Sequence, residues 1–145
     1  MALSYKATIR AAMLDAITTA AGNAALLQIY DSTGTGKPAT AGGAVTTQQK
    51  LVQVTLGTPF AGAASATVDG AAVTLTLTDP ASVNTAIAGT ATWFRIVKAD
   101  TTTFVMDGTV STIAAGTGDL QLSNTTLILA QPVDIGSFVI SEANI

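Results

Sequence analysis

The sequence predicts a mainly β protein, an antiparallel β-sandwich or jelly-roll-like barrel with one N-terminal α-helix. Two features of the chain lead to this prediction. Short runs with β-branched and aromatic residues at every second position alternate with turns rich in Gly, Pro, Asn and Asp. A helical period is confined to residues 4–21. The 145 residues suit a single domain, 1–145, with the helix over 4–21 and the sandwich over 25–145.

The predicted helix has one apolar stripe at helical spacing. Its members are Ile9, Met13, Ala16, Ile17 and Ala20. Ser4 is a suitable N-cap, and Gly22-Asn23 is the expected stop because both residues tolerate a left-handed conformation. The stripe has two interpretations: it covers an open face or end of the β core, or the helix is an arm that docks on a neighbouring subunit.

A short apolar strand over 25–31 is followed by a surface loop of Gly, Thr and Pro over 32–44. Gly34, Gly36 and Lys37 stand close together, as in a phosphate-binding loop. The spacing of that motif is absent, however, and Pro38 follows the lysine where a helix would have to begin. We therefore expect no phosphate site in this loop.

Two further strands are expected before the middle of the chain. Residues 50–56 alternate apolar and polar positions and end at a Gly-Thr-Pro turn. Asp69-Gly70 is a strong hairpin signal. After it, residues 71–78 place three large aliphatic side chains on one face and Thr on the other, which indicates a strand with one wet face.

Residues 89–108 predict the core hairpin of the fold. The first arm places Trp93 and Arg95 on one face and Phe94 and Ile96 on the other. Large apolar side chains on both faces are typical of a strand that is covered on both sides. The residues expected in the core are Trp93, Phe94, Ile96, Phe104 and Met106.

The second arm of this hairpin follows a polar turn at 100–102. It closes on Asp107-Gly108, or extends through residues 109–111. Further short strands are expected at 120–122 and 125–130, and an extended pair fills residues 132–145 with Gly136 as its bend.

Composition excludes several classes of function. The chain has no Cys and no His, so thiolate metal sites, disulfides, Cys nucleophiles and Ser-His triads are excluded. We predict no catalytic residue, no cofactor and no metal. Six scattered basic residues make no patch for nucleic acid, and no apolar run is long enough for a membrane span or a secretory signal.

Most carboxylates stand where turns are expected, next to Gly, Pro, Ser, Thr or Leu. These are Asp31, Asp69, Asp79, Asp100, Asp107 and Asp119. A Ca²⁺ site built from Asp31, Asp69 and Asp119 is an alternative use of three of them. Arg95 either forms a structural ion pair with an Asp or stacks beside Trp93 in a sugar- or peptide-binding groove.

Charged residues make up only 10% of the chain, and the net charge is −3. So few charges do little to keep a lone protein dispersed. Either the protein buries much of its surface in an assembly, or its surface is polar without charge because it is rich in Thr.

Taken in order, several segments together resemble a family of small virion structural proteins of tailed bacteriophages. They cover nearly the whole chain, and no single one is diagnostic. The segments are the opening helix with Arg10 and DAI at 15–17, LLQIYD at 26–31, KPATAGGA at 37–44, LVQVTLGTPF at 51–60, AAVTLTL at 71–77, GTATWFRIVKAD at 89–100, MDGTV at 106–110, LQLSNTTL at 120–127 and QPVDIGSFVISEAN at 131–144.

The resemblance implies a non-enzymatic decoration or cement protein that binds and stabilises the outer surface of the capsid. Its partners would be the major capsid protein and further copies of itself, as a dimer or trimer, and it would be made in the host cytoplasm. A head–tail or tail structural protein is one alternative. A virion-displayed carbohydrate-binding sandwich that stacks sugars on Trp93, Tyr30 or Phe60 is another. Residues expected to contact a partner are Ile9, Met13, Ile17, Lys37 and Pro38.

Overall fold

The computed structural model describes residues 5–142 except 33, 35, 66–72 and 78–80. The described part of the chain is mainly β, with one helix at its N-terminal end, as predicted. Its elements are α1 (Ala7–Ala21), β1 (Leu26–Tyr30), β2 (Lys50–Thr55), β3 (Val73–Thr76), β4 (Val83–Asn84), β5 (Gly89–Thr90), β6 (Trp93–Val97), β7 (Phe104–Thr112), β8 (Leu120–Leu122), β9 (Thr126–Leu127), β10 (Pro132–Val133) and β11 (Ile135–Glu142).

Within the described residues, seven strands form one sheet in the order β2-β1-β6-β7-β8-β11-β3, and β10-β4 and β5-β9 form two small sheets. This arrangement is compatible with the predicted β-sandwich. The large sheet is mixed because β7 and β8 pair in parallel. The short connection between them folds back onto β7, where the Gly118 N–H donates to the Ser111 hydroxyl at 2.9 Å.

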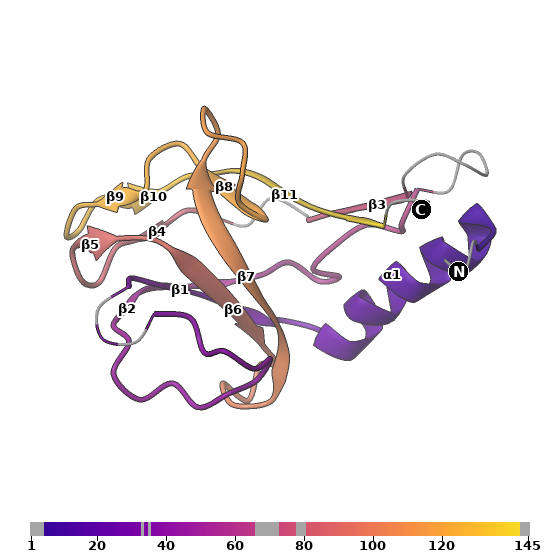
Figure 1. The fold of residues 1–145 in the computed structure, drawn as a ribbon, viewed down its shortest axis with the longest axis horizontal. Coiled ribbons are helices and arrows are strands. Elements are labelled where there is room, and N and C mark those ends of the chain that lie inside the picture. The colour runs from indigo at the N-terminus through magenta and orange to yellow at the C-terminus, as the bar shows by residue number, and fades with distance from the viewer. Residues whose placement is uncertain (1–4, 33, 35, 66–72, 78–80, 143–145) are drawn as a thin grey trace.

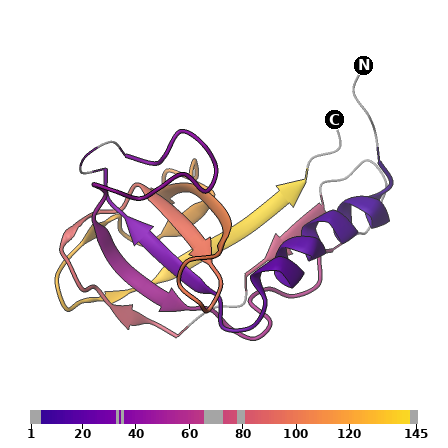
Figure 2. The same ribbon diagram turned by 90° about the horizontal axis from the view of Figure 1, so that it is seen from below.

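The molecule has a rounded β body and an extension (Figures 1 and 2). α1, β3 and the last part of β11 form the extension. β11 joins the two parts because its first half pairs with β8 and its second half pairs with β3. Phe138 lies at the junction, buried, with its ring edge against Phe94 at a centroid distance of 5.1 Å.

The predicted core hairpin is confirmed as β6 and β7, and every residue of β6 is buried. Phe94 and Ile96 belong to the main core of the body. Trp93 is buried on the opposite face. Met106 is half-buried and packs against the main core, whereas the half-buried Phe104 lies under Arg95. The expected core residues therefore divide between two faces of one hairpin.

The prediction that the second arm closes on Asp107-Gly108 is wrong, and the longer alternative holds. β7 continues to Thr112, and Gly108 lies opposite Phe94 in the ladder. A Cβ at Gly108 would stand 2.7 Å from Phe94 Cε1, so glycine here makes room for the ring. Asp107 is likewise a mid-strand residue, where it pairs with Arg95 in register.

The helix turns a different face to the β core than its stripe predicted. Its buried positions are Ala7, Arg10, Ala11, Leu14 and Ala21. Ile9 and Met13 are 48% and 50% exposed, so they do not cover the core. Small alanines let α1 lie close to β3, and the Asp15 carboxylate accepts a hydrogen bond from the Ala64 N–H at 2.7 Å. The helix thus packs through alanines, Leu14 and Arg10, with Asp15 as a polar anchor.

The helix boundaries agree in part with the prediction. α1 begins at Ala7 after Lys6, and the suggested cap Ser4 lies outside the described residues. Gly22 ends it with φ 70°, as expected. In the described part of the chain, no helix is long and apolar enough to cross a membrane.

Other predicted elements are shorter or lie outside the described residues. The strand expected at 125–130 is reduced to β9, because residues 128–131 form a turn. The strand after Asp69-Gly70 is observed as β3, with Val73 and Leu75 buried and Thr facing outward. The Asp69-Gly70 turn itself is not among the described residues.

Phe94→Ala should destabilise the protein by about 3–5 kcal/mol, because it removes a fully buried ring from the junction of hairpin and β11. Urea unfolding followed by circular dichroism measures the change. Ile113→Ala is the matched control, since Ile113 is half exposed on the β7–β8 connection, and it should shift the free energy of unfolding by less than about 0.5 kcal/mol. Equal losses for the two variants would contradict this account of the core.

Asp100 orders the turn between β6 and β7. Hydrogen bonds from the Thr103 hydroxyl, the Thr103 N–H and the Thr102 N–H lower its pKa from 3.8 to about 2. Because the folded pKa is depressed, the stabilisation is fully present above the ordinary value of 3.8 and is lost as pH falls through about 2.

A carboxyl-carbon NMR titration should therefore place the Asp100 midpoint near pH 2. The resonance is assigned by its loss in Asp100→Asn. A midpoint near the ordinary carboxyl value would mean that these hydrogen bonds do not persist in solution.

Candidate interaction surfaces

The described part of the chain between β1 and β2, which includes residues 36–49, covers the outer face of the hairpin. Residues 32–44 were predicted as a surface loop, and the described inner side of this segment is packed on the strands below. Gly42 lies on the Phe104 ring, where a Cβ would stand 3.2 Å from the ring carbons. The Gly43 carbonyl accepts a hydrogen bond from Arg95 Nη1 at 2.9 Å. The covered face forms a second, smaller core.

Arg95 is the centre of this second core. Its guanidinium lies 5.6 Å from the Trp93 ring centroid and 5.3 Å from that of Phe104. Its Nη2 donates to Asp107 Oδ2 at 3.0 Å, and both side chains are almost fully buried. The structural ion pair predicted for Arg95 is confirmed. A guanidinium held between two rings and a carboxylate is far better placed to fix a loop than to receive a ligand.

Trp93 and Tyr30 are stacked beneath the same loop. Their ring centroids are 4.2 Å apart with an interplanar angle of 9°, and the indole N–H donates to the Asp31 carbonyl at 3.0 Å. Tyr30 donates in turn to Gln28 Oε1 at 2.9 Å. Burial raises the pKa of the Tyr30 phenol, and the charge of Arg95 partly opposes that shift.

The aromatic residues proposed as sugar platforms do not present a free face. Trp93, Tyr30 and Phe60 are 1%, 5% and 0% exposed. A sugar ring stacks on an accessible aromatic face, and each of these faces is occupied by protein. The geometry therefore gives the carbohydrate-binding alternative no support at the residues that suggested it.

Lys37 and Pro38, two of the expected partner contacts, belong to the covering loop. Lys37 Nζ lies 3.7 Å from Asp107 Oδ1, so it adds a second cation to the buried carboxylate while its side chain stays 37% exposed. Pro38 is half-buried and lies so close to Gly43 that a Cβ added to this glycine would stand 3.0 Å from the Pro38 Cβ. Both residues already contribute to the fold of the loop.

Ile9 and Met13, two further expected contacts, lie on the outward face of α1. The exposed positions of the described helix from residue 8 onward are all uncharged: Thr8, Ile9, Ala12, Met13, Ala16, Thr19 and Ala20. Tyr5, just before the helix, is exposed as well. Ile17 differs, since it is half-buried and packs against the main core. The structure thus leaves Ile9 and Met13 available to a partner and turns Ile17 partly away.

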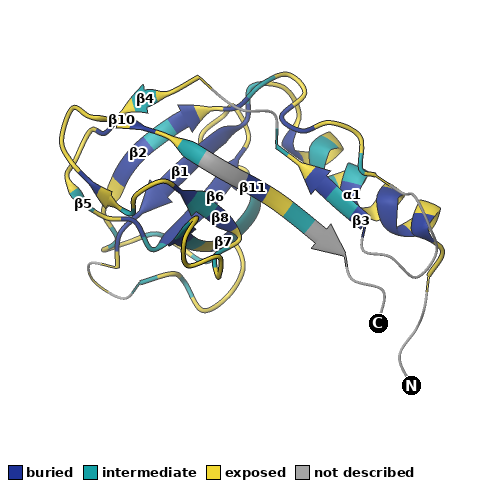
Figure 3. Cartoon of the chain, turned by 90° about the horizontal axis from the view of Figure 1, so that it is seen from above, coloured by how far each residue is buried: buried dark blue, intermediate teal, exposed yellow. Residues whose placement is uncertain are grey.

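A second group of exposed aliphatic side chains lies at the opposite end of the molecule. Ile87, in the β4–β5 connection, and Ile128 and Leu129, in the β9–β10 connection, are large and exposed. The two connections lie side by side, because β4 pairs with β10 and β5 with β9 (Figures 1 and 3). Sequence reasoning assigned residues 125–130 to a strand and did not single out these side chains.

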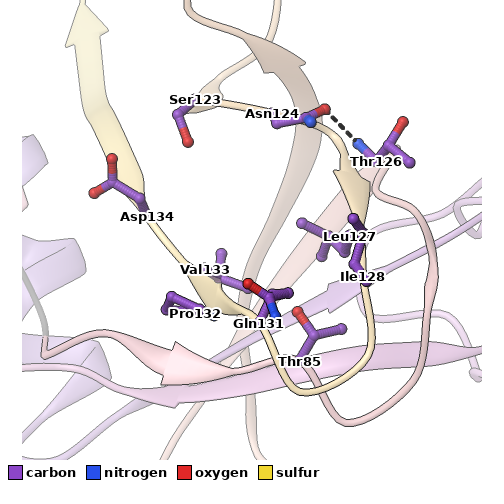
Figure 4. Close-up of a pocket in the computed structure, with 10 residues that line it drawn as sticks. All are labelled: Thr85, Ser123, Asn124, Thr126, Leu127, Ile128, Gln131, Pro132, Val133 and Asp134. Atoms are coloured by element: carbon purple, nitrogen blue, oxygen red, sulfur yellow. Dashed lines mark hydrogen bonds between the residues drawn. The ribbon is translucent and has the colours of Figure 1, made fainter.

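A small pocket opens beside the β9–β10 connection (Figure 4). Its volume is about 170 Å³. Ser123 and Asn124 lie on one side of it, and Thr85 and Gln131 on the other. A drug-sized ligand needs about 300 Å³ or more, so this pocket suits a single side chain better than a cofactor or an oligosaccharide.

The Ca²⁺ alternative finds no support among the residues that the structure describes. There, no three His, Cys, Asp or Glu side chains gather at metal-binding distance. Asp31 accepts from the Gln49 N–H, Asp119 accepts from Thr109, and Asp69 lies outside the described residues. Asp100 and Asp119 act at turns as predicted, whereas Asp31 follows β1 and pairs with Gln49 across the β1–β2 connection. Asp79, like Asp69, lies outside the described residues.

Comparison with known proteins gave no match to a family model, to a curated protein or to a solved structure.

Removing the charge of Arg95 should weaken the packing of the covering loop on the hairpin and make the loop more mobile. Arg95→Met leaves the Asp107 carboxylate buried without its closest cation, so we expect a loss of about 3–5 kcal/mol and faster amide hydrogen exchange over residues 39–46. Replacing both partners, Arg95→Met with Asp107→Leu, should recover most of that loss because no buried charge is left unpaired.

Lys98→Met, at the exposed hairpin turn, is the charge-matched control and should change stability by less than about 0.5 kcal/mol. Unchanged exchange in the loop of Arg95→Met would show that packing on Phe104, and not Arg95, holds the loop.

Proposed function

We propose that this protein is a non-enzymatic structural protein of a tailed-phage virion that binds and stabilises the outer surface of the capsid. Its partners are the major capsid protein and further copies of itself, and its location is the capsid surface. The observation that carries the proposal is the uncharged, apolar outward face of α1, which the protein does not use in its own core.

The exposure of this face has a physical consequence. Ile9 and Met13 lie one turn apart on the helix, and burying both against a partner would remove several tens of square ångströms of apolar surface from water per side chain. When exposed aliphatic side chains that do not pack in the core gather on one face of a protein, they indicate an interaction site. With only 10% charged residues, electrostatic repulsion does little to oppose that contact.

The resemblance to virion structural proteins supports the same assignment. A shell-binding protein needs shape-complementary faces and many weak contacts repeated over a symmetric lattice, so its affinity comes from valency. It needs no nucleophile and no cofactor. The buried ion pair, the stacked rings and the covering loop serve rigidity, which reduces the entropy lost on binding.

Among the expected contacts, the helix face is the stronger candidate for the capsid. Lys37 and Pro38 are engaged by Asp107 and Gly43, whereas Ile9 and Met13 have no comparable role in the fold. We therefore assign the capsid contact to α1 and leave the covering loop a structural role.

Capsids that lack this protein should bind a fixed number of copies of the purified chain, as measured by cosedimentation and densitometry. The double variant Ile9→Asp, Met13→Asp should bind at least about 10-fold more weakly, because a charge is placed in the centre of an apolar contact. Ile113→Asp, at a half-exposed isoleucine far from α1 in sequence, is the matched control and should bind as the unaltered chain does.

Two results would contradict the proposal. Absence of binding to capsids would reject the decoration role, and binding only to particles with an assembled neck or tail would favour the head–tail alternative. Equal weakening by the control would show that the helix face has no special role. Circular dichroism of each variant confirms that the fold is retained.

A further inference from the structure

The β9–β10 connection is a tight turn with an unusual sequence. The Gln131 N–H donates to the Ile128 carbonyl at 3.1 Å, which closes a four-residue turn over Ile128, Leu129, Ala130 and Gln131. Ala130 has φ 61°, a conformation that Gly or Asn adopts at much lower cost. A non-glycine residue held there stores strain of about 1 kcal/mol or more.

The turn is held rigidly from behind by the β4–β5 connection. The Ala130 N–H donates to the Thr85 carbonyl at 2.9 Å, and the Thr85 N–H donates to the Gln131 carbonyl at 2.8 Å. Thr85 itself is buried. These two bonds fix the backbone on both sides of the turn, and with it the positions from which the side chains at its tip project.

The side chains at positions 128 and 129 are apolar and largely exposed. Ile128 and Leu129 are 61% and 59% exposed, the highest values among the large hydrophobic side chains described. Turn tips usually hold Gly, Pro, Asn, Asp or Ser, because these residues suit both turn geometry and water. A turn with a fixed backbone and two exposed aliphatic side chains is suited to anchor a partner, because little backbone freedom is lost on binding.

The same surface also holds a receptor for such an anchor. The apolar part of the pocket lining consists of Leu127, Ile128, Pro132 and Val133. The rest is neutral and polar, and Asp134 is the one charged residue among its described lining. Its volume of about 170 Å³ is close to that of a cavity of about 150 Å³ that holds a benzene-sized group. A leucine side chain is smaller than benzene, so the pocket is large enough to take one.

We propose that this end of the molecule is a twofold self-association surface, in which Leu129 of each copy enters the pocket beside the β9–β10 turn of the other. A twofold contact joins one patch to itself, so the patch must contain both the inserted group and its receptor. Here the two are adjacent on one rigid turn, and the centre of the contact is poor in charge, as in other protein interfaces.

This inference deepens the self-association part of the proposed function and does not depend on the capsid contact. It uses the end of the molecule opposite to α1, so self-association and capsid binding can fail independently. Sedimentation of the purified chain alone tests the first, whereas cosedimentation with capsids tests the second.

Sedimentation velocity and equilibrium over a range of concentrations should reveal a dimer of the unaltered full chain. Leu129→Asp should weaken its dimerisation constant at least about 30-fold, the loss expected of a hot-spot residue. Ser123→Trp, which fills the pocket from its exposed rim without altering Leu129, should weaken it to a similar degree. Ile113→Asp is the control and should dimerise normally.

Several results would overturn the inference. A monomer at all concentrations would reject the surface outright, and an undiminished dimer of Leu129→Asp would reject Leu129 as the anchor. Dissociation by Leu129→Asp but not by Ser123→Trp would reject the pocket as the receptor. A dimer that only Ile9→Asp, Met13→Asp dissociates would assign self-association to α1 instead. Near-identical circular dichroism spectra exclude unfolding as the cause.

Discussion

The structure depends first on the contact of Phe94 with Gly108 and Phe138. The Phe94 ring lies over the glycine of the neighbouring strand and meets the edge of Phe138, which belongs to the strand that joins body and extension. Without that glycine, the ring would have no space. Close packing at this point therefore connects the hairpin, the parallel β7–β8 pair and the extension that carries α1.

The other face of the hairpin is held by electrostatics rather than by aliphatic packing. Arg95, Asp107 and Lys37 form a charged group under the covering loop. The guanidinium lies over the rings of Trp93 and Phe104, and Tyr30 stacks on Trp93. A buried ion pair adds little net stability compared with an apolar pair, but removing one partner is costly because it leaves the other charge buried and unpaired. The consequence is one defined loop conformation in a chain with few other charges.

Two apolar surfaces lie at opposite ends of the long axis, the outward face of α1 and the β9–β10 turn with its neighbour (Figure 1). Under both proposals the turn joins two copies and the helices face the shell. A dimer then presents two helices, and binding of the first raises the effective concentration of the second. Modest contacts at each helix would suffice for stable occupancy of a repetitive lattice.

The local sequence pattern determined the mainly β fold, the N-terminal helix that ends at Gly22, the Trp93–Met106 hairpin and the pairing of Arg95 with an aspartate. It could do so because the spacing of apolar residues, the turn-forming residues and complementary charges act over short distances. Only the tertiary structure decided which face of α1 is buried, since the buried face holds alanines, Leu14 and Arg10 in place of the expected stripe. It also decided that Gly108 makes room for Phe94 and is no turn, and that Ile128 and Leu129 lie at the tip of a turn. Each of these depends on neighbours distant in the chain, and no local pattern encodes them.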